Sequence, residues 1–181
     1  MNLTEIGRLG HWVDLTKLNK DSVIIDAGAC SGEFIEEIRK MVNCKIIAIE
    51  PDIDSFKTLE GKNFDNVELH NNALVGNGEP ELSTFYSYPL KELGNIFNLY
   101  PGSFGGNIVK NIKTQDLPTA DYIKMDIEGA EKLLLEDKID TKQISIEVHN
   151  NCNADEIIKK LEEQGFSCQK MPRSEVYGFK E

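Results

Sequence analysis

Short apolar runs alternate with amphipathic stretches along most of the chain. Runs typical of buried strands occupy 23–26, 45–50, 66–74, 121–129 and 143–150. Stretches with a helical period of apolar residues occupy 32–42, 51–61, 130–137 and 153–165. Strands that alternate with helices predict a doubly wound α/β fold, in which a mostly parallel sheet is covered by helices on both faces. The tail after Gly165 predicts a closing β-hairpin that turns near Pro172.

Two segments depart from this alternation. Apolar residues recur loosely through 3–18, interrupted by Gly7 and Gly10, and predict an N-terminal helix within 1–20. Residues 76–116 are rich in Gly, Asn, Tyr and Phe, and we expect an insertion that serves as a lid or binding loop. With 181 residues, the whole chain is predicted to form a single domain.

The charge balance narrows the range of partners. The formal net charge is −11 and no basic run occurs, so we expect neither nucleic acid nor an anionic membrane as a partner. A chain with this negative charge binds a cationic or neutral small molecule more readily than a polyanion. The N-terminus has no basic start followed by an apolar core, and no apolar run approaches the ~20 residues that span a bilayer. Four scattered cysteines without a CxxC pair indicate free thiols and a cytoplasmic location: Cys30, Cys44, Cys152 and Cys168.

The loop after the first strand carries the first functional signal. The stretch VIIDAGACSGEF (23–34) places only small residues between Asp26 and Glu33. It has Gly28-x-x-x-Gly32, and lacks both the G-x-G-x-x-G of dinucleotide sites and the phosphate-loop pattern. Two flanking carboxylates would repel a pyrophosphate but favour a ligand with positive groups. S-adenosylmethionine carries a sulfonium and an ammonium, and is the cofactor that we expect.

Two later strand ends complete a predicted adenosyl site. Glu50 lies 22 residues after Gly28, a spacing at which an acidic residue accepts hydrogen bonds from ribose hydroxyls. Asn72 could read the adenine edge while Ala73 leaves room for the ring. The alternative is that the small residues only allow close packing, and that Glu50 only begins a helix. The predicted cofactor-binding residues are Asp26, Gly28, Ala29, Gly32, Glu33, Glu50, Pro51, Asn72, Ala73 and Asp126.

These segments resemble a known family. The stretches DAGACSG and IAIEPD are similar to class I S-adenosylmethionine-dependent methyltransferases, and DYIKMDIEGAE (121–131) resembles the most distinctive part of the FkbM-type family. The resemblance spans about residues 20–165. It implies a seven-stranded Rossmann-like domain that transfers a methyl group, commonly to a hydroxyl oxygen of a sugar or natural product. The chain is short for that family, with little before its first strand.

Polar residues at the ends of the fourth and fifth predicted strands are candidates for catalysis. Side chains alternate along a strand, so Glu147 and His149 project on the same face. His149 is the best general base by its ordinary pKa. Lys124 and Asp126 could instead form a structural ion pair, and a divalent metal bound by these groups is not expected. The predicted catalytic residues are Asp126, Glu128, Glu147 and His149.

The sequence therefore predicts a cytoplasmic S-adenosylmethionine-dependent methyltransferase that acts on a hydroxyl of a saccharide or another small polar metabolite. Two alternatives stay open: a non-catalytic nucleoside-binding module, and a nicotinamide-dependent oxidoreductase, which would lack its phosphate fingerprint. The acceptor and the oligomeric state are not indicated.

Overall fold

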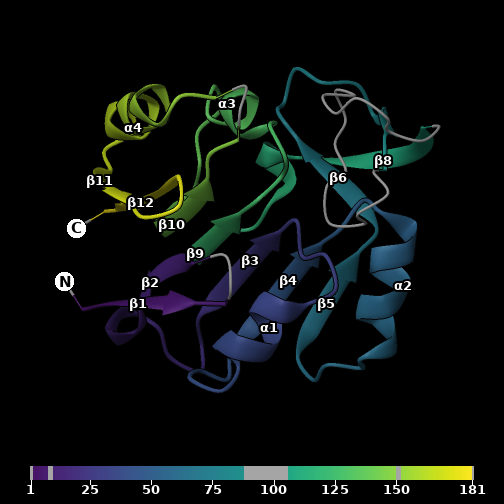
Figure 1. The fold of residues 1–181 in the computed structure, drawn as a ribbon, viewed down its shortest axis with the longest axis horizontal. Helices are drawn as coiled ribbons and strands as arrows, with labels where there is room; N and C mark the ends of the chain where they lie inside the picture. Colours follow the sequence, from purple (N-terminus) through teal and green to yellow (C-terminus); the bar gives the residue numbers. More distant parts are fainter. Residues whose placement is uncertain (1, 8–9, 88–105, 150–151, 181) are drawn as a thin grey trace.

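A seven-stranded sheet forms the centre of the computed structural model, which describes residues 2–7, 10–87, 106–149 and 152–180 (Figure 1). The strand order is β11-β12-β10-β9-β3-β4-β5. All neighbouring pairs are parallel except β10–β12 and β11–β12. The strands are β3 (Val23–Ala27), β4 (Lys45–Ile49), β5 (Val67–His70), β9 (Ala120–Met125), β10 (Thr141–Glu147), β11 (Ser167–Met171) and β12 (Glu175–Phe179). The predicted mostly parallel sheet and its C-terminal hairpin are confirmed.

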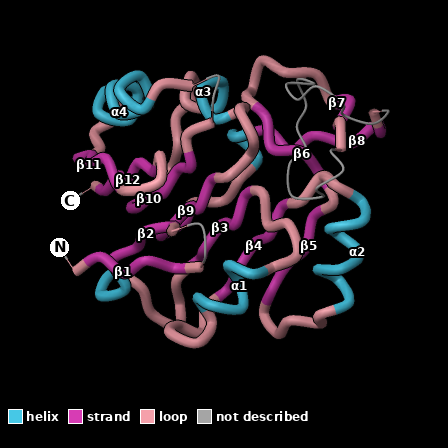
Figure 2. The backbone as a smooth tube through the Cα atoms, viewed as in Figure 1, coloured by secondary structure: helices cyan, strands magenta, loops and turns pink. Residues whose placement is uncertain are grey.

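Helices cover both faces of this sheet, as Figures 1 and 2 show. One face packs against α3 (Glu131–Leu134) and α4 (Ala154–Glu163), and buries Leu134, Ile157 and Leu161. The other face packs against α1 (Glu33–Ile38) and α2 (Ile53–Gly61). The Asn153 side chain caps α4 as a hydrogen-bond acceptor from Asp155 N, as its N-cap pattern leads one to expect.

The N-terminal segment is a β-hairpin, and the predicted helix within 1–20 is wrong. Its strands are β1 (Leu3–Ile6) and β2 (His11–Asp14), followed by the short 3-10 helix η1 (Leu15–Lys17). Gly7 and Gly10 have φ values of +74° and +89°, a left-handed backbone that ends any helix here and allows the turn. Ile6 and Val13 then pack on the same sheet face as α1. The hairpin thus occupies the place that we expected a helix to fill.

The insertion after β5 is partly a second small sheet. β6 (Asn72–Val75), β7 (Leu82–Phe85) and β8 (Asn107–Lys113) form it in the order β6-β8-β7, and η2 (Thr114–Asp116) follows. The expected third strand at 66–74 is accordingly split into β5 and β6. Residues 88–105, within the expected lid of 76–116, lie outside the described residues.

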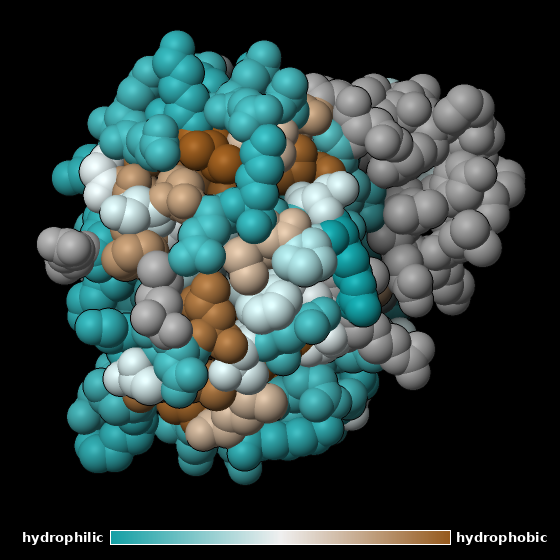
Figure 3. All heavy atoms as spheres, turned by 60° about the vertical axis from the view of Figure 1, so that its left-hand side comes forward, coloured by the Kyte–Doolittle hydropathy of each residue, from teal (hydrophilic) through white to brown (hydrophobic). Residues whose placement is uncertain are grey.

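The surface is described by its hydropathy. On the face drawn in Figure 3, hydrophobic residues form separate areas within a mostly hydrophilic surface. Among the described residues, no helix is long and apolar enough to cross a membrane.

Candidate functional site

The loop between β3 and α1 is held against the end of β9. Gly28 has a φ of +78°, and a Cβ added to it would lie 1.7 Å from the carbonyl oxygen of Asp126. Gly28 N and Ala29 N both donate hydrogen bonds to Ile49 O, at 2.9 and 3.1 Å. Gly32, with a φ of +86°, precedes α1, and a Cβ there would lie 2.6 Å from Leu59 Cδ1. The protein's own packing therefore requires glycine at positions 28 and 32.

Glu50 fastens the same loop to the end of β4. Its Oε2 accepts a hydrogen bond from Cys30 N at 2.6 Å, and its Oε1 accepts one from Asp52 N at 2.7 Å. The side chain is buried, and burial raises the pKa of Glu50 to about 7, although these backbone hydrogen bonds act in the opposite direction. Each oxygen keeps a second lone pair, so the carboxylate can still accept hydrogen bonds from a ligand.

The two residues predicted to surround adenine, Asn72 and Ala73, have different contacts. Asn71, not Asn72, reaches the predicted ribose residue: its Nδ2 donates to Glu50 O at 2.8 Å and to Pro51 O at 3.3 Å. Asn72 Nδ2 donates to Lys110 O in the neighbouring strand, and Ala73 is buried in the small core of the β6-β8-β7 sheet. An adenine contact by Asn72 stays a prediction.

A buried ion pair lies beneath the loop. Lys124 Nζ is 3.1 Å from Asp26 Oδ1 and 3.8 Å from Asp126 Oδ2, and donates to Gly28 O at 2.5 Å. Burial lowers the pKa of Lys124, but the two carboxylates more than offset this and raise it above its ordinary value. Asp26 is fully buried, and its carboxylate is paired with Lys124. Glu33, at the start of α1, is exposed, and cofactor contacts by Asp26 and Glu33 stay predictions.

Three carboxylates around the turn between β9 and α3 meet at His149. Its Nδ1 is hydrogen-bonded to Glu131 Oε1 at 2.8 Å, and its Nε2 lies 3.3 Å from Glu128 Oε2 and 3.6 Å from Asp126 Oδ1. Burial lowers the pKa of His149, but the hydrogen bond and charge of Glu131 and the other carboxylates raise it to about 9. At neutral pH the ring is thus protonated, which argues against the predicted role of His149 as a general base.

Glu131 is a site residue that sequence reasoning missed. It is fully buried and accepts hydrogen bonds from Gly129 N at 3.1 Å and Ile127 N at 3.4 Å, in addition to its contact with His149. Glu128 has a φ of +54°, so the turn that Glu131 holds is in a left-handed conformation. The signal was available in the final residue of DIEGAE (126–131), but that glutamate was not among the predicted site residues.

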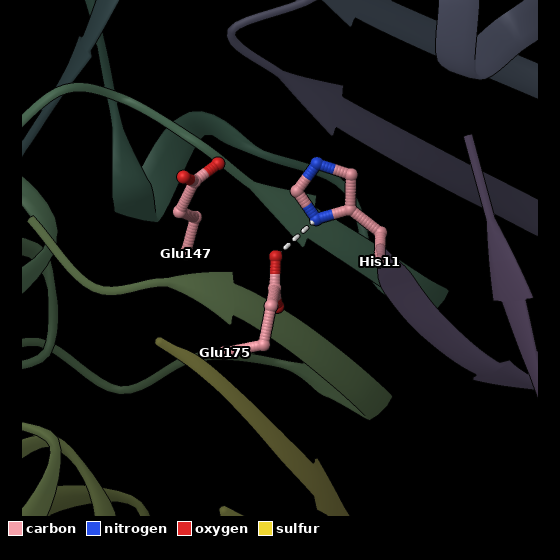
Figure 4. Close-up of side chains that lie close together, drawn as sticks. All are labelled: His11, Glu147 and Glu175. Carbon is pink, nitrogen blue, oxygen red and sulfur yellow. Dashed lines mark ion pairs between the residues drawn. The ribbon is translucent and has the colours of Figure 1, made fainter. Parts of the chain in front are cut away.

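Glu147 lies at the end of β10, directly opposite Glu175 of β12 in the antiparallel register. Ser145 Oγ donates to Glu175 Oε2 at 2.8 Å, and His11 Nδ1 lies 2.7 Å from Glu175 Oε1 (Figure 4). Burial raises the pKa of Glu175 to about 8, and burial together with Asp126 raises the pKa of Glu147 to about 7. Burial and then the charge of Lys124 lower the pKa of His11 to about 4. No sequence pattern pointed to His11 or Glu175.

The structure therefore brings all four predicted catalytic residues to one edge of the sheet, where β9, β10 and β12 meet. Carboxyl groups outnumber cations there. The acidic members are Asp26, Asp126, Glu128, Glu131, Glu147 and Glu175, and the basic ones are Lys124, His11 and His149.

The residues at this edge lie in a stretch that matches a known protein family. Residues 107–168 match the family model described as "Methyltransferase FkbM domain". Over this stretch the chain resembles the FkbM methyltransferase family. The matched stretch includes Asp126, Glu128, Glu147 and His149. The expected family resemblance, methyltransferase activity and dependence on S-adenosylmethionine are confirmed, and the acceptor is not indicated.

Solved structures resemble the chain over most of its length. A ribosomal protein L11 methylase from Lactobacillus delbrueckii subsp. bulgaricus has a TM-score of 0.54 and 12% identity, and the match covers 90% of this chain and 72% of that one. A methyltransferase from Geobacter sulfurreducens has a TM-score of 0.53 and 11% identity, with 92% and 73% covered. Precorrin-6y C5,15-methyltransferase from Geobacter metallireducens has a TM-score of 0.51 and 17% identity, with 92% and 85% covered. Identities this low show the methyltransferase fold alone. No curated protein matches the sequence.

Proposed function

We propose that this chain methylates a hydroxyl oxygen of a small polar acceptor, such as a saccharide, in the cytoplasm. The observation that carries the proposal is the position of Glu147. Its carboxyl is half-buried at the centre of the acidic edge, and among the described residues it makes no hydrogen bond or ion pair. A hydroxyl acceptor must lose a proton as its oxygen is methylated, and a carboxylate without a partner is available to take it.

The residues at the loop fit the cofactor that the family implies. S-adenosylmethionine supplies an electrophilic methyl group on a positively charged sulfur. Glu50 keeps free lone pairs beside the loop of 28–32 and would accept hydrogen bonds from the ribose hydroxyls. The excess of carboxyl groups at the ends of β9 and β10 favours the ammonium and sulfonium charges. Asp126, which is partly exposed and whose backbone carbonyl lies against Gly28, is the candidate to face them. The donor set thus supports a cationic nucleoside more than a pyrophosphate.

The roles of the chain's residues in transfer follow from their positions. Glu147 accepts the proton of the acceptor hydroxyl. His149, held as a cation by Glu131 and flanked by Glu128, orients Asp126 and the turn before α3 rather than taking a proton itself. The remaining requirement is alignment of the hydroxyl oxygen with the methyl carbon in a site that excludes water.

An acceptor screen with isotope-labelled cofactor tests the proposal. We expect label transfer to hydroxyl-bearing saccharides or related metabolites, and a product whose methyl group is bound to oxygen by NMR. Glu147→Gln should lower kcat by about 10²- to 10⁴-fold with little change in cofactor affinity. Glu162→Gln, on the exposed side of α4, is the matched control.

Several outcomes contradict this proposal. Methyl transfer only to nitrogen or carbon acceptors would overturn the oxygen assignment. A Glu147→Gln variant with wild-type kcat would overturn the role of Glu147. Calorimetric titration with S-adenosylhomocysteine against NAD separates the remaining alternatives, because tighter NAD binding would favour an oxidoreductase.

A further inference from the structure

Three side chains from distant parts of the chain converge at one point of the acidic edge. His11 comes from β2, Glu147 from the end of β10 and Glu175 from the start of β12 (Figure 4). A ring nitrogen of His11 and one oxygen of each carboxyl group lie within 4.8 Å of one another. His11 is 3% exposed and Glu175 is 1% exposed, so two of the three groups are almost fully removed from water.

The contact between His11 and Glu175 is not a hydrogen bond. His11 Nδ1 and Glu175 Oε1 are 2.7 Å apart, yet both are buried polar atoms without a hydrogen-bond partner among the described residues. The oxygen therefore lies off the line along which the ring nitrogen donates or accepts. Two ligands of one ion have this relationship, because each points at the ion while they stand about 3 Å apart. Buried unpaired polar atoms in a folded protein require such an explanation.

The carboxyl groups of Glu147 and Glu175 also have too little positive charge near them, which favours binding of a cation. The nearby Lys124 is paired with Asp26 and Asp126. Within the described parts of the chain, His11 is the only basic group at ion-pair distance from Glu175, and Glu147 has none. Two carboxyl groups facing each other in a poorly hydrated place are costly unless a positive charge lies between them.

A second group at this edge is less suited to a metal ion. Asp126, Glu147 and His149 also bring ligand atoms within 4.8 Å of one another. Both ring nitrogens of His149, however, already face carboxylates, Nδ1 through a 2.8 Å hydrogen bond to Glu131 and Nε2 at 3.3 Å from Glu128. Metal binding there would have to break these contacts, whereas the His11 group has atoms that lack partners.

We propose that His11, Glu147 and Glu175 bind one divalent ion of the Mn²⁺ to Zn²⁺ series. One imidazole and two carboxylates suit these ions better than Mg²⁺ or Ca²⁺, which prefer oxygen ligands alone. Ligands about 2.0–2.2 Å from a shared ion stand at most about 4.4 Å apart, so the observed separation closes with a small rotation of Glu147, the least buried of the three. Three protein ligands leave a coordination position open, as in catalytic rather than structural sites.

The position of the ion gives it a use in methyl transfer, and this step rests on the proposed function. The acceptor hydroxyl would occupy the open position, where the ion lowers its pKa. Glu147 binds the ion through one oxygen and takes the hydroxyl proton with the other. The acceptor's O–C bond then forms as the S–C bond of the sulfonium breaks, and S-adenosylhomocysteine leaves.

Ion binding is tested directly on the chelator-treated chain, purified without a polyhistidine tag. We expect calorimetry to show that Mn²⁺, Co²⁺ and Zn²⁺ each bind at one site per chain, and that each ion raises the Tm. Bound Co²⁺ should also give visible absorption bands typical of nitrogen and oxygen ligands. His11→Gln and Glu175→Gln should weaken the Kd by at least about tenfold. His70→Gln is the matched control, because the His70 ring is paired with Glu68 on its own strand β5, at the opposite side of the sheet from β12.

Binding of S-adenosylhomocysteine by each variant reports whether that variant is folded. If His11→Gln or Glu175→Gln does not fold, Glu147→Gln, at the least buried of the three positions, takes its place. Absence of ion binding by the wild type, or equal binding by the wild type and the folded variants, overturns the inference. Methyl transfer to hydroxyl acceptors without ion binding would leave the proposed function intact and reject only the metal site. Ion binding that the variants abolish, without transfer to any hydroxyl, would support the metal site and reject the proposed function.

Discussion

The backbone of Gly28 and the carbonyl group of Asp126 lie so close together that no side chain fits between them. A Cβ at position 28 would be 1.7 Å from that oxygen. The contact joins the loop after β3 to the end of β9, and so sets the spacing between the expected cofactor loop and the acidic edge. This close approach is internal to the protein, and it explains why position 28 carries no side chain.

Gly28→Ala should therefore destabilise the protein. We expect a loss of about 2 to 4 kcal/mol in the free energy of unfolding, from the overlap with Asp126 O and the left-handed φ of +78° together. Urea unfolding followed by circular dichroism measures it. Gly78→Ala is the control, since a Cβ there meets nothing within 4 Å, and equal stability of the two variants would contradict the geometry of the loop.

Glu50→Ala should weaken binding of S-adenosylhomocysteine by about 10- to 100-fold. The substitution removes the expected acceptor of the ribose hydroxyls, and also the hydrogen bonds that hold Cys30 N and Asp52 N. Calorimetry gives the Kd, with Glu60→Ala on the exposed side of α2 as the control. An unchanged Kd would place the ribose elsewhere.

Cofactor affinity should depend on pH through the same carboxyl group. With the pKa of Glu50 raised to about 7, its ionised fraction and hence its capacity to accept two ribose hydrogen bonds increase from pH 6 to pH 8. We expect the Kd to fall by about tenfold over this range in the wild type, and much less in Glu50→Gln. A flat profile in the wild type would count against Glu50 as the group that titrates.

The stability of the unliganded protein should follow the opposite trend. A carboxyl group whose pKa is higher in the folded state binds protons that the unfolded state has already released. The contribution of Glu50 is therefore fully present below pH ~4.5 and is lost as the pH rises to about 7. The difference in unfolding free energy between Glu50→Gln and the wild type, measured at pH 5 and pH 8, isolates this contribution and should shift in favour of the variant at pH 8. A shift in the other direction would show that the hydrogen bonds to Cys30 N and Asp52 N outweigh burial.

Glu131→Gln should destabilise the turn before α3. Oε1 of the buried carboxylate accepts from two backbone N–H groups and contacts His149, and an amide oxygen could keep these contacts. The amide removes the negative charge that faces the protonated His149, and it turns Oε2, which accepts from Cys152 Sγ at 3.6 Å, into a donor. We expect a loss of about 1 to 3 kcal/mol in the free energy of unfolding by urea titration. Glu136→Gln, whose carboxyl is exposed and paired with Lys160, should change it far less, and similar losses in both would show that Glu131 is not the organising residue.

The sheet was predictable because its strands carry local patterns. Runs such as VIID and KIIAIE are apolar enough to be recognised as buried parallel strands without any knowledge of their neighbours. The N-terminal hairpin was not, since its loose apolar spacing fits a helix, and only the left-handed backbone at Gly7 and Gly10 decides against one. Local periodicity could not show this difference.

The site was predictable only where its residues follow strand ends. Glu50, Asp126 and Glu147 end or follow strands that meet at one edge of the sheet, and the topology rule places such residues together. His11 and Glu175 join the site through β2 and β12, whose packing against β10 depends on tertiary contacts. The protonation state of His149 could likewise not be predicted from the sequence, because its raised pKa results from three carboxylates brought together by folding.

The pairing of His11 with Glu175 has a consequence for how the protein is made. β2 is among the first elements to leave the ribosome, whereas β12 is the last strand of the central sheet to emerge. A nascent or C-terminally shortened chain can therefore collapse around β3, β4 and β9 and still lack the His11 cluster. A chain shortened before Glu175 should therefore lack any chemistry that depends on this cluster.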